Sequence, residues 1–310
     1  MGKLVNPFDL PGRWYKANLH THTTTSDGTQ PPAQRVAQYR DAGYDVLALT
    51  DHMVTNDVSP YKTGKMLVIS GIEMHPPCPS LSGTNYHIVG LSVPRNFTLS
   101  NPNDANRCIA DVTAASGITI LAHPYWCGQS LKDFKDLKGL SAIEVFNSTC
   151  DTCGRGSSEH EWDNAVDSGM VLPAIGVDDA HQKEPGEELF ETWTWLKMPS
   201  LSVDNVLEAV RTGACYTSRG PTIQDFGVAD GRLYLKCSPV IAIYFKAGAA
   251  SGQRRRAAIG GTIDFFDKPL NLKEKYVRAV VIDQHGRQAW TNPIFMGQYE
   301  DALALEGLTK

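Results

Sequence analysis

Residues 14–22 read WYKANLHTH, a strand-like run that ends in two histidines separated by one residue. Because alternate residues of an extended chain point to the same side, we expect His20 and His22 to face one point and to share one cation. The same arrangement, a short apolar run followed by histidine or acid, recurs through the first two thirds of the chain. The stretch therefore predicts a buried strand with a polar site at its end.

Seven runs rich in Val, Ile and Leu are predicted as buried strands. They are Trp14–His20, Asp45–Thr50, Met66–Ile72, His87–Val93, Ile118–Ala122, Ala142–Phe146 and Val171–Val177. Helical stretches that stop at a glycine lie between several of them: Pro32–Ala42 before Gly43, Asp104–Ser116 before Gly117, Ser157–Ser168 before Gly169 and Val203–Thr212 before Gly213. A glycine just past a helix end favours the left-handed conformation. Strands alternating with helices indicate parallel units, and seven of them with both faces covered favour an α/β barrel over an open sheet.

After about Gly213 the pattern changes to short, often alternating segments separated by turn signals at Asp230-Gly231 and His285-Gly286. The predicted strands are Arg232–Cys237, Val240–Phe245, Tyr276–Ile282 and Ala289–Phe295. We therefore expect an α/β barrel in residues 1–213 and a small antiparallel β-rich module in residues 214–310. The module could cap the active site or mediate dimerisation, and the sequence does not rank these roles or give the oligomeric state.

The composition is that of a soluble globular protein, with 310 residues, 42% hydrophobic and 20% charged. The net charge of -5 gives no general attraction to nucleic acid, and the triplet Arg254–Arg256 is predicted to be a solvated loop. No apolar run is long enough to span a membrane, and the start of the chain lacks a signal-peptide pattern. Seven cysteines at irregular spacing favour a reducing compartment, so we expect a cytoplasmic protein with no nucleic-acid or membrane partner.

Six of the nine histidines lie at or after the ends of predicted strands, together with acidic residues. A single histidine in such a place is more often a hydrogen-bonded structural group, but independent structural explanations would have to coincide many times here. In βα barrels the carboxyl ends of the strands meet on one face, so distant residues can share a pocket. The predicted metal ligands are His20, His22, Asp27, His52, Glu73, His87, His123, Asp179 and His181. His75 and His285 are predicted to be surface groups.

Imidazoles with carboxylates form a ligand set that suits Zn, Mn or Fe. Nine ligands are too many for one ion, so we expect two or three divalent cations, with Glu73 as a bridge. Such a pair can hold a hydroxide as nucleophile and clamp the attacking and leaving oxygens. We expect Glu73, Asp179 and His181 to be catalytic, and Asp51 and Asp178 to orient the imidazoles.

At this point the sequence resembles the polymerase and histidinol phosphatase (PHP) superfamily of metallohydrolases. The motifs that carry the resemblance lie within residues 13–182: HTH at 20–22, SDG at 26–28, TDH at 50–52, GIE at 71–73, HIVG at 87–90, AHP at 122–124 and DAH at 179–181. The segments GRWYK at 12–16 and WTNPI at 290–294 also resemble the stand-alone branch that includes the carbaryl hydrolase.

The resemblance implies a distorted (β/α)7 TIM-like barrel and up to three metals. It implies that His20, His22, Glu73 and Asp179 hold one cation, that Glu73, His87 and His123 hold a second, and that Asp27, His52 and His181 hold the third. His87 begins its apolar run instead of ending it, so its place in the pocket depends on the resemblance. The ligand set is complete.

The leading hypothesis is a phosphoesterase acting on a small, anionic phosphomonoester or phosphodiester, with metal-held hydroxide as nucleophile. The candidate substrate-binding residues are Arg155, Arg219 and His160. The two arginines are chosen because a guanidinium fork matches phosphate oxygens. The first alternative is hydrolysis of a carbamate or carboxylic ester by the same cluster. The second is a catalytically silent metal-binding interaction module. The sequence does not identify the natural substrate.

Overall fold

Seven short strands form the centre of the molecule, and they match the seven runs predicted from the sequence. The computed structural model describes residues 4–62, 65–182, 188–248 and 251–298. The strands are β1 (Arg13–Asn18), β2 (Val46–Leu49), β3 (Leu67–Met74), β4 (Ile88–Leu91), β5 (Ile118–Leu121), β6 (Ala142–Asn147) and β7 (Ala174–Val177). β2, β4, β5, β6 and β7 are buried at every position, as expected of strands that are covered on both faces.

β4 runs against its neighbours, which corrects the prediction of seven parallel units. β1, β2 and β3 pair in parallel, as do β5, β6 and β7, whereas β4 pairs antiparallel with both β3 and β5. Residues 75–87, all of them described, contain no helix, and Pro77 bridges Asn85 in the antiparallel sense. A parallel neighbour needs a longer crossover, usually a helix. The short excursion therefore returns the chain in the opposite direction.

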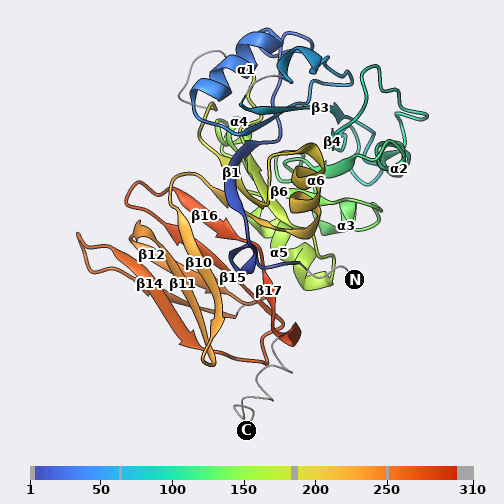
Figure 1. Cartoon of the computed structure of the whole chain (residues 1–310). Coiled ribbons are helices and arrows are strands. Elements are labelled where there is room, and N and C mark those ends of the chain that lie inside the picture. The colour runs from blue at the N-terminus through green and yellow to red at the C-terminus, as the bar shows by residue number, and fades with distance from the viewer. Residues whose placement is uncertain (1–3, 63–64, 183–187, 249–250, 299–310) are drawn as a thin grey trace.

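The helices within the described residues cover the outside of the strands close to the predicted places (Figure 1). They are α1 (Pro32–Asp41), α2 (Ala105–Ala114), α3 (Leu131–Phe134), α4 (Ser148–Asp151), α5 (Glu159–Ser168) and α6 (Val203–Thr212), with 3-10 turns at Pro7–Asp9, Ser59–Tyr61 and Met296–Gln298. α1 packs on β2, α2 on β4 and β5, and α5 on β6. The single turns α3 and α4 were not predicted, because four residues are too few to show a helical period.

Three of the four predicted helix-ending glycines have the left-handed conformation, with φ of 77° at Gly43, 91° at Gly169 and 74° at Gly213. The prediction is wrong for Gly117, because Ser116 takes the left-handed conformation there, with φ of 64°. Gly117 is required for a different reason. A Cβ atom at this position would lie 2.4 Å from the backbone carbonyl oxygen of Leu91.

An eighth strand, β8 (Trp193–Met198), completes the barrel and was not predicted. It pairs antiparallel with β1 and faces β7. The hydroxyl of Thr194 accepts the N–H of Gly176 (3.0 Å) and donates to the carbonyl of the same residue (2.9 Å). Gly176 allows this approach, because a Cβ there would lie 2.3 Å from Cγ2 of Thr217. The prediction of an α/β, TIM-like barrel is thus confirmed. Where β7 meets β8, the hydroxyl of Thr194 makes the hydrogen bonds to the backbone of Gly176.

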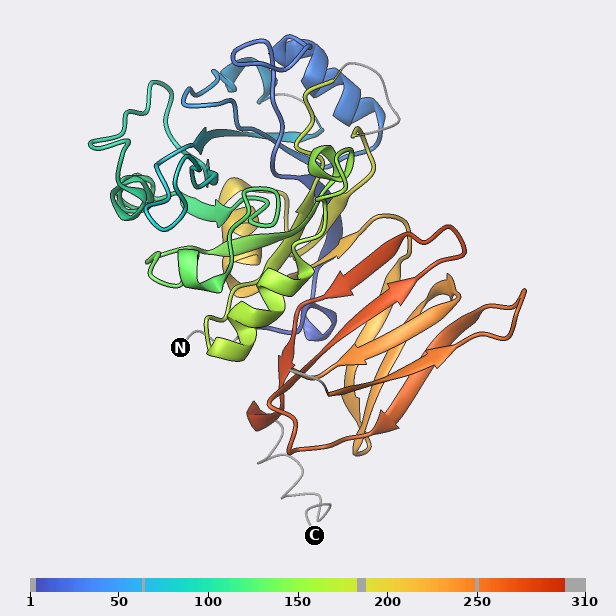
Figure 2. The same ribbon diagram turned by 180° about the vertical axis from the view of Figure 1, so that it is seen from behind.

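The C-terminal segments form an antiparallel β module beside the barrel (Figure 2). Its strands are β9 (Cys215–Ser218), β10 (Ile223–Ala229), β11 (Arg232–Val240), β12 (Ala242–Lys246), β13 (Gly252–Arg256), β14 (Ile263–Pro269), β15 (Tyr276–Ile282), β16 (Gln288–Thr291) and β17 (Ile294–Phe295). β10, β11 and β14 form one sheet, and the order β13-β12-β15-β16-β9-β8-β1 joins the others to the barrel. An apolar cluster that includes Phe226, Leu235 and Phe245 fills the module.

The turns that separate these strands agree with the sequence in two places. Asp230 and Gly231 both have positive φ, 49° and 67°, as a tight hairpin turn requires. Gly286 has φ of 79° in the second turn. The arginine triplet Arg254–Arg256 is not a loop, because it belongs to β13, an exposed strand paired with β12. Arginines on an edge strand remain solvated while their backbone pairs.

The module and the barrel are also joined by charged groups. Arg278 on β15 is fully buried and donates to Glu159 (2.7 Å) and Asp163 (2.7 Å) on α5. Its guanidinium also lies over the ring of Trp162, 4.6 Å from the centroid. The division at residue 213 stays a prediction, because the strand that follows it, β9, is hydrogen-bonded both to β8 and to β16.

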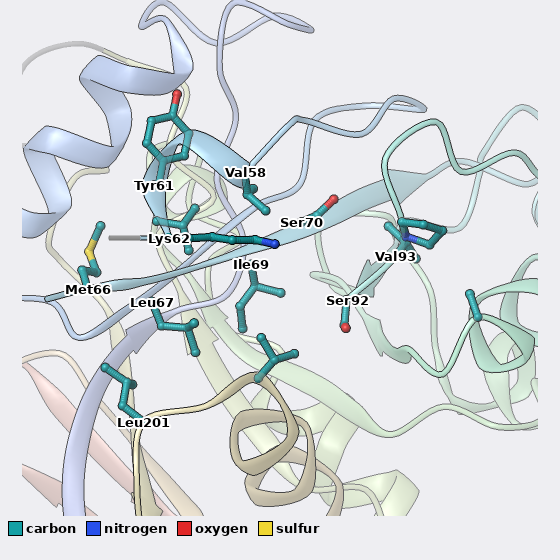
Figure 3. A pocket seen from close by; sticks show the side chains of 14 residues that line it. Val58, Tyr61, Lys62, Met66, Leu67, Ile69, Ser70, Ser92, Val93 and Leu201 are labelled. Carbon is teal, nitrogen blue, oxygen red and sulfur yellow. The ribbon is translucent and has the colours of Figure 1, made fainter. Parts of the chain in front are cut away.

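A cavity of about 700 Å³ lies on the outside of β3, away from the polar strand ends (Figure 3). Its walls are largely aliphatic and include Leu67, Ile69, Val93 and Leu201. None of the predicted metal ligands lines it. In the described part of the chain, no helix has the length and apolar character needed to cross a membrane.

Candidate metal centre

The segments that follow β1 and β7 lie side by side because their backbones are hydrogen-bonded. The N–H of Asp179 donates to the carbonyl of His20 (3.0 Å), and the N–H of His22 donates to the carbonyl of Ala180 (3.0 Å). In the same way, a parallel bridge between His52 and Glu73 extends the pairing of β2 and β3 beyond the end of β2. The polar side chains of these segments therefore meet at one edge of the barrel.

The direction of β4 explains how His87 reaches this edge. His87 precedes β4, and Ile88 pairs with Met74 at the end of β3 and with Leu121 at the end of β5. The start of an antiparallel strand thus lies level with the ends of its neighbours. The Nδ1 atom of His87 is 2.8 Å from Oε1 of Glu73.

Four buried side chains form the middle of the cluster. The Nε2 atoms of His20 and His22 are 3.1 Å apart and lie 3.5 and 3.4 Å from Oε2 of Glu73. The same two nitrogens lie 3.1 and 2.9 Å from Oδ1 of Asp179. Two atoms that bind one zinc ion at about 2.1 Å in tetrahedral geometry are about 3.4 Å apart. The spacing in this group is close to that of ligand atoms around one cation.

On one side of this group, Glu73 and His123 continue the cluster. The Nε2 atom of His123 lies 3.4 Å from Oε1 of Glu73 and 3.7 Å from Oδ2 of Asp179. Because His87 approaches the same Oε1, the Glu73 carboxylate faces histidines with both oxygens. This is the position that a bridging carboxylate would occupy.

On the other side, Asp27 lies between two histidines. Its Oδ2 atom is 3.3 Å from Nε2 of His52, and its Oδ1 atom is 3.5 Å from Nε2 of His181. Nδ1 of His181 lies 2.7 Å from the backbone carbonyl of Asp179, which it can reach only by donating a proton. That bond leaves the lone pair on Nε2, directed at the cluster. All nine predicted ligands are therefore brought together.

The cluster fits a metal centre because buried carboxylate oxygens in it have no hydrogen-bond donor. Oε2 of Glu73 and Oδ1 of Asp179 are both buried without a partner. Burial raises the pKa of each acid, but His20 and the other histidines lower it further, so the net effect is a pKa below the usual value in both. Unpartnered buried carboxylates are costly unless a cation compensates them. Together with imidazoles, they form a set that could hold divalent cations of the Zn, Mn or Fe kind.

A residue that the sequence interpretation missed, Glu144 on β6, orients the histidines. Its Oε1 accepts from Nδ1 of His20 (2.7 Å), and its Oε2 accepts from the N–H of His123 (3.0 Å) and from Asn147 (3.0 Å). A proton on Nδ1 leaves the lone pair of His20 on Nε2, where a cation would need it. The signal was present in the sequence, because Glu144 is a lone acid within the apolar run Ala142–Phe146.

Asp51 and Asp178, predicted to orient imidazoles, accept hydrogen bonds from other groups. Asp51 is linked to an imidazole through Ser26, whose Oγ donates to Asp51 (2.6 Å) and lies 3.5 Å from Nδ1 of His22. Asp51 accepts from the backbone and hydroxyl of Thr23 and of Ser26, which holds the loop that carries Asp27. Asp178 accepts from Tyr39 (2.8 Å) and from three backbone N–H groups of residues 190–192. Burial raises the pKa of Asp178 to about 7, against the effect of these donors.

Two of the predicted ligands have an unusual backbone conformation. His123 has φ of 27° and Asp179 has φ of 57°, in a region that residues with a side chain seldom adopt. Such conformations cost about 1–3 kcal/mol each and persist where the surroundings hold them. Each is the second residue after its strand, β5 for His123 and β7 for Asp179, and its side chain lies in the cluster.

Two adjoining cavities give access to the cluster. One, of about 470 Å³, is lined by several of the predicted ligands and by Trp126, Thr149 and Glu188. The second, of about 540 Å³, shares His87 and Trp126 with it and also contains Arg155. The ring of Trp126 lies 5.5 Å from that of His87, and 42% of this residue is exposed. Trp126 is therefore placed to contact a bound molecule.

The three predicted substrate-binding residues are placed differently. Arg155 is exposed and lines the second cavity. Arg219 donates to Asp151 (3.1 Å) and lies over the ring of Phe146, 4.0 Å from its centroid, and it lines neither cavity. His160 is exposed on α5 and lines neither of them. The geometry favours Arg155 as a substrate contact over the other two.

His75 is not the surface group that was predicted. It directly follows β3, and its ring centroid is 4.5 Å from that of His52 and 4.2 Å from that of His87. Its Nε2 atom is buried and lies 3.5 Å from Oε2 of Glu73. His285, in contrast, is exposed in its turn, as predicted.

Comparison with solved structures identifies the architecture. A two-domain protein from Bacteroides vulgatus, described as containing a predicted PHP-like metal-dependent phosphoesterase, matches with a TM-score of 0.56 and 16% identity over 93% of this chain and 98% of that chain. The fold is PHP-like. The match includes the β module as well as the barrel, because it covers 93% of this chain. Likeness to the carbaryl hydrolase branch stays a prediction.

Two other solved structures match with lower scores. An amidohydrolase from Chromobacterium violaceum, solved with sulfate and no metal, has a TM-score of 0.42 and 17% identity over 56% of this chain and 89% of that one. A protein from Bifidobacterium adolescentis, provisionally described as a metal-dependent phosphoesterase, has a TM-score of 0.39 and 16% identity over 64% and 96%. No protein-family model and no curated protein matches the chain.

Proposed function

We propose that this protein is a metal-dependent hydrolase that cleaves a small, anionic phosphate ester. The observation that carries the proposal is a cluster of imidazoles and buried, unpartnered carboxylate oxygens that opens into a cavity next to an exposed arginine, Arg155. Divalent cations bound there would supply an activated water and neutralise phosphate oxygens. The proposed catalytic residues are Glu73, Asp179 and His181.

The chain's own groups would orient the substrate around this centre. Trp126 forms part of the wall of both cavities, so the organic part of an ester would lie against its indole. The guanidinium of Arg155 would hold an anionic group by paired N–H donors. Glu188 accepts the N–H of His181 (2.7 Å) and the hydroxyl of Thr149 (2.7 Å), which fixes one wall of the pocket.

The test compares an aryl phosphate with the corresponding aryl acetate, using the full chain loaded with Mn²⁺ or Zn²⁺. We expect turnover of the phosphate, loss of turnover after chelation and recovery when the cation is restored. Turnover of the acetate without the phosphate would favour the carbamate or carboxylic ester alternative and contradict the proposal. Turnover of neither substrate by fully loaded protein would favour the silent module.

The role of Arg155 has its own measurement. We expect Arg155→Ala to raise KM for the phosphate by about tenfold while kcat changes less, because a contact made equally in the ground and transition states affects binding alone. Arg254→Ala is the control, because Arg254 is also exposed but lies on β13. An unchanged KM in Arg155→Ala would remove this residue from the substrate site.

A further inference from the structure

Three buried polar atoms without hydrogen-bond partners lie around one point, two of them on predicted ligands and the third on His75. They are Nδ1 of His52, Oε2 of Glu73 and Nε2 of His75. Nδ1 of His52 is only 2.7 Å from Oε2 of Glu73, yet the two atoms are not aligned for a hydrogen bond. Nε2 of His75 approaches the same oxygen at 3.5 Å. Buried polar groups nearly always have a partner, so three without one in the same place indicate a missing ligand.

The chemistry of the three atoms specifies the ligand. Two imidazole nitrogens and one carboxylate oxygen form the set that holds zinc in catalytic sites, where a fourth position stays open. The distance of 3.5 Å between His75 and Glu73 is close to the spacing of about 3.4 Å expected for two atoms on one tetrahedral zinc ion.

We propose that His75 is a further ligand of the metal centre, at a cation position formed with Oε2 of Glu73 and Nδ1 of His52. The proposal also assigns the nitrogens of His52, because a neutral imidazole has one lone pair. With Nδ1 at the cation, Nε2 carries the proton and faces Oδ2 of Asp27, 3.3 Å away. His52 then is not a ligand on the Asp27 side, where the resemblance had placed it.

The ring positions fit this arrangement. His75 lies between His52 and His87, with centroid distances of 4.5 and 4.2 Å. His75 is the first residue after β3, so the strand end that presents Glu73 also presents His75, two residues later. Side chains two apart in extended structure point to the same side. The spacing is the one that brings His20 and His22 together.

The test measures bound cations on the purified full chain without substrate. We expect His75→Ala to lose one Zn²⁺ per chain relative to the wild type by elemental analysis, or to bind its weakest ion at least about tenfold less tightly in chelator competition. His160→Ala is the matched control, because His160 is exposed on α5, and it should behave like the wild type. Equal zinc content and equal affinity in His75→Ala and the wild type would overturn the proposal.

A second variant covers the case in which His75→Ala folds poorly. His75→Asn keeps a polar group, and the visible absorption of Co²⁺-loaded protein reports the loss of a nitrogen ligand. An unchanged Co²⁺ spectrum in this variant would overturn the assignment. Neither measurement involves an ester, so failure to cleave phosphate would contradict the proposed function and leave the ligand assignment intact.

Discussion

Glu144→Gln is expected to weaken metal binding although Glu144 lies behind the ligands. One carboxylate oxygen accepts from Nδ1 of His20 and the other from the N–H of His123 and from Asn147. A glutamine replaces one of these oxygens with an NH2 group, so at least one donor faces another donor. If that donor is His20, its imidazole can recover the bond only by moving its proton to Nε2, which removes the lone pair that a cation needs.

The magnitude follows from these contacts. Loss of a partner that orients a metal-binding imidazole costs about 10–100-fold in affinity, which corresponds to about 1.4–2.7 kcal/mol. A hydrogen bond to a charged group contributes about 1.5–3 kcal/mol, in the same range. We therefore expect the dissociation constant for Zn²⁺ or Mn²⁺ to rise by 10–100-fold.

The assay is competition with a chromogenic chelator, together with thermal unfolding of the metal-free protein as a check of folding. Glu161→Gln is the matched control, because Glu161 is also a buried acid but lies on α5, and one of its oxygens has no hydrogen-bond partner. An affinity of Glu144→Gln within about twofold of the wild type, with the control unchanged, would refute the orienting role.

Three further predictions concern stability. Chelation should lower Tm by several degrees, and restored cations should reverse the loss, because they bind the folded chain preferentially. Glu159→Gln should lower the free energy of unfolding at pH 7 by about 1–3 kcal/mol, by denaturant titration. Burial raises the pKa of Glu159, but Arg278 and Lys246 lower it below the unfolded value of 4.5. The contribution is therefore present above pH 4.5 and lost as the pH falls through the folded pKa, so a difference that persists in acid would contradict it. Gly176→Ala should cost about 1–3 kcal/mol through overpacking, whereas Gly261→Ala, whose Cβ would have room, should be neutral.

Several strands of the barrel could be predicted because burial on both faces makes them apolar runs, as in Val46–Leu49 and Ile118–Leu121. The ends of four runs were also visible, since a histidine or an acid lies within two residues after β1, β2, β5 and β7. β8 was not predicted, because its residues alternate between buried and half-buried positions and the buried ones include threonine. Thr194 and Lys197 interrupt the apolar residues of this segment, so it lacks the continuous apolar pattern of β2 or β5, although the fold places it against β1.

Strand direction is the information that the sequence lacked. An apolar run has the same composition in both directions, so His87 could be placed in the pocket only through the family resemblance. The antiparallel direction of β4 supplies the physical reason for its position. His75 was taken for a surface group for a related reason, because nothing in the sequence shows which way the chain turns after β3.

Buried charges gave a signal that was not used. Glu144 interrupts the apolar run of β6, and a carboxylate at such a position must have partners. Arg278 interrupts β15 in the same way and has Glu159 and Asp163 as partners. For Arg219 and His160 the substrate-binding role stays a prediction, and neither lines the cavities at the cluster. A cation in a loop or on a helix surface can point in many directions, and sequence spacing does not select one.

The ladder that runs from β16 through β9 and β8 to β1 has a consequence for attempts to divide the chain. A chain that ended near residue 213 would lack β9. Its strand β8 would then be an open edge, next to β1, the strand that presents His20. Open edges pair with other molecules, so a barrel produced alone is expected to self-associate. Exchange of the β module between relatives would then have to transfer β9 together with β16, because neither strand completes the sheet without the other.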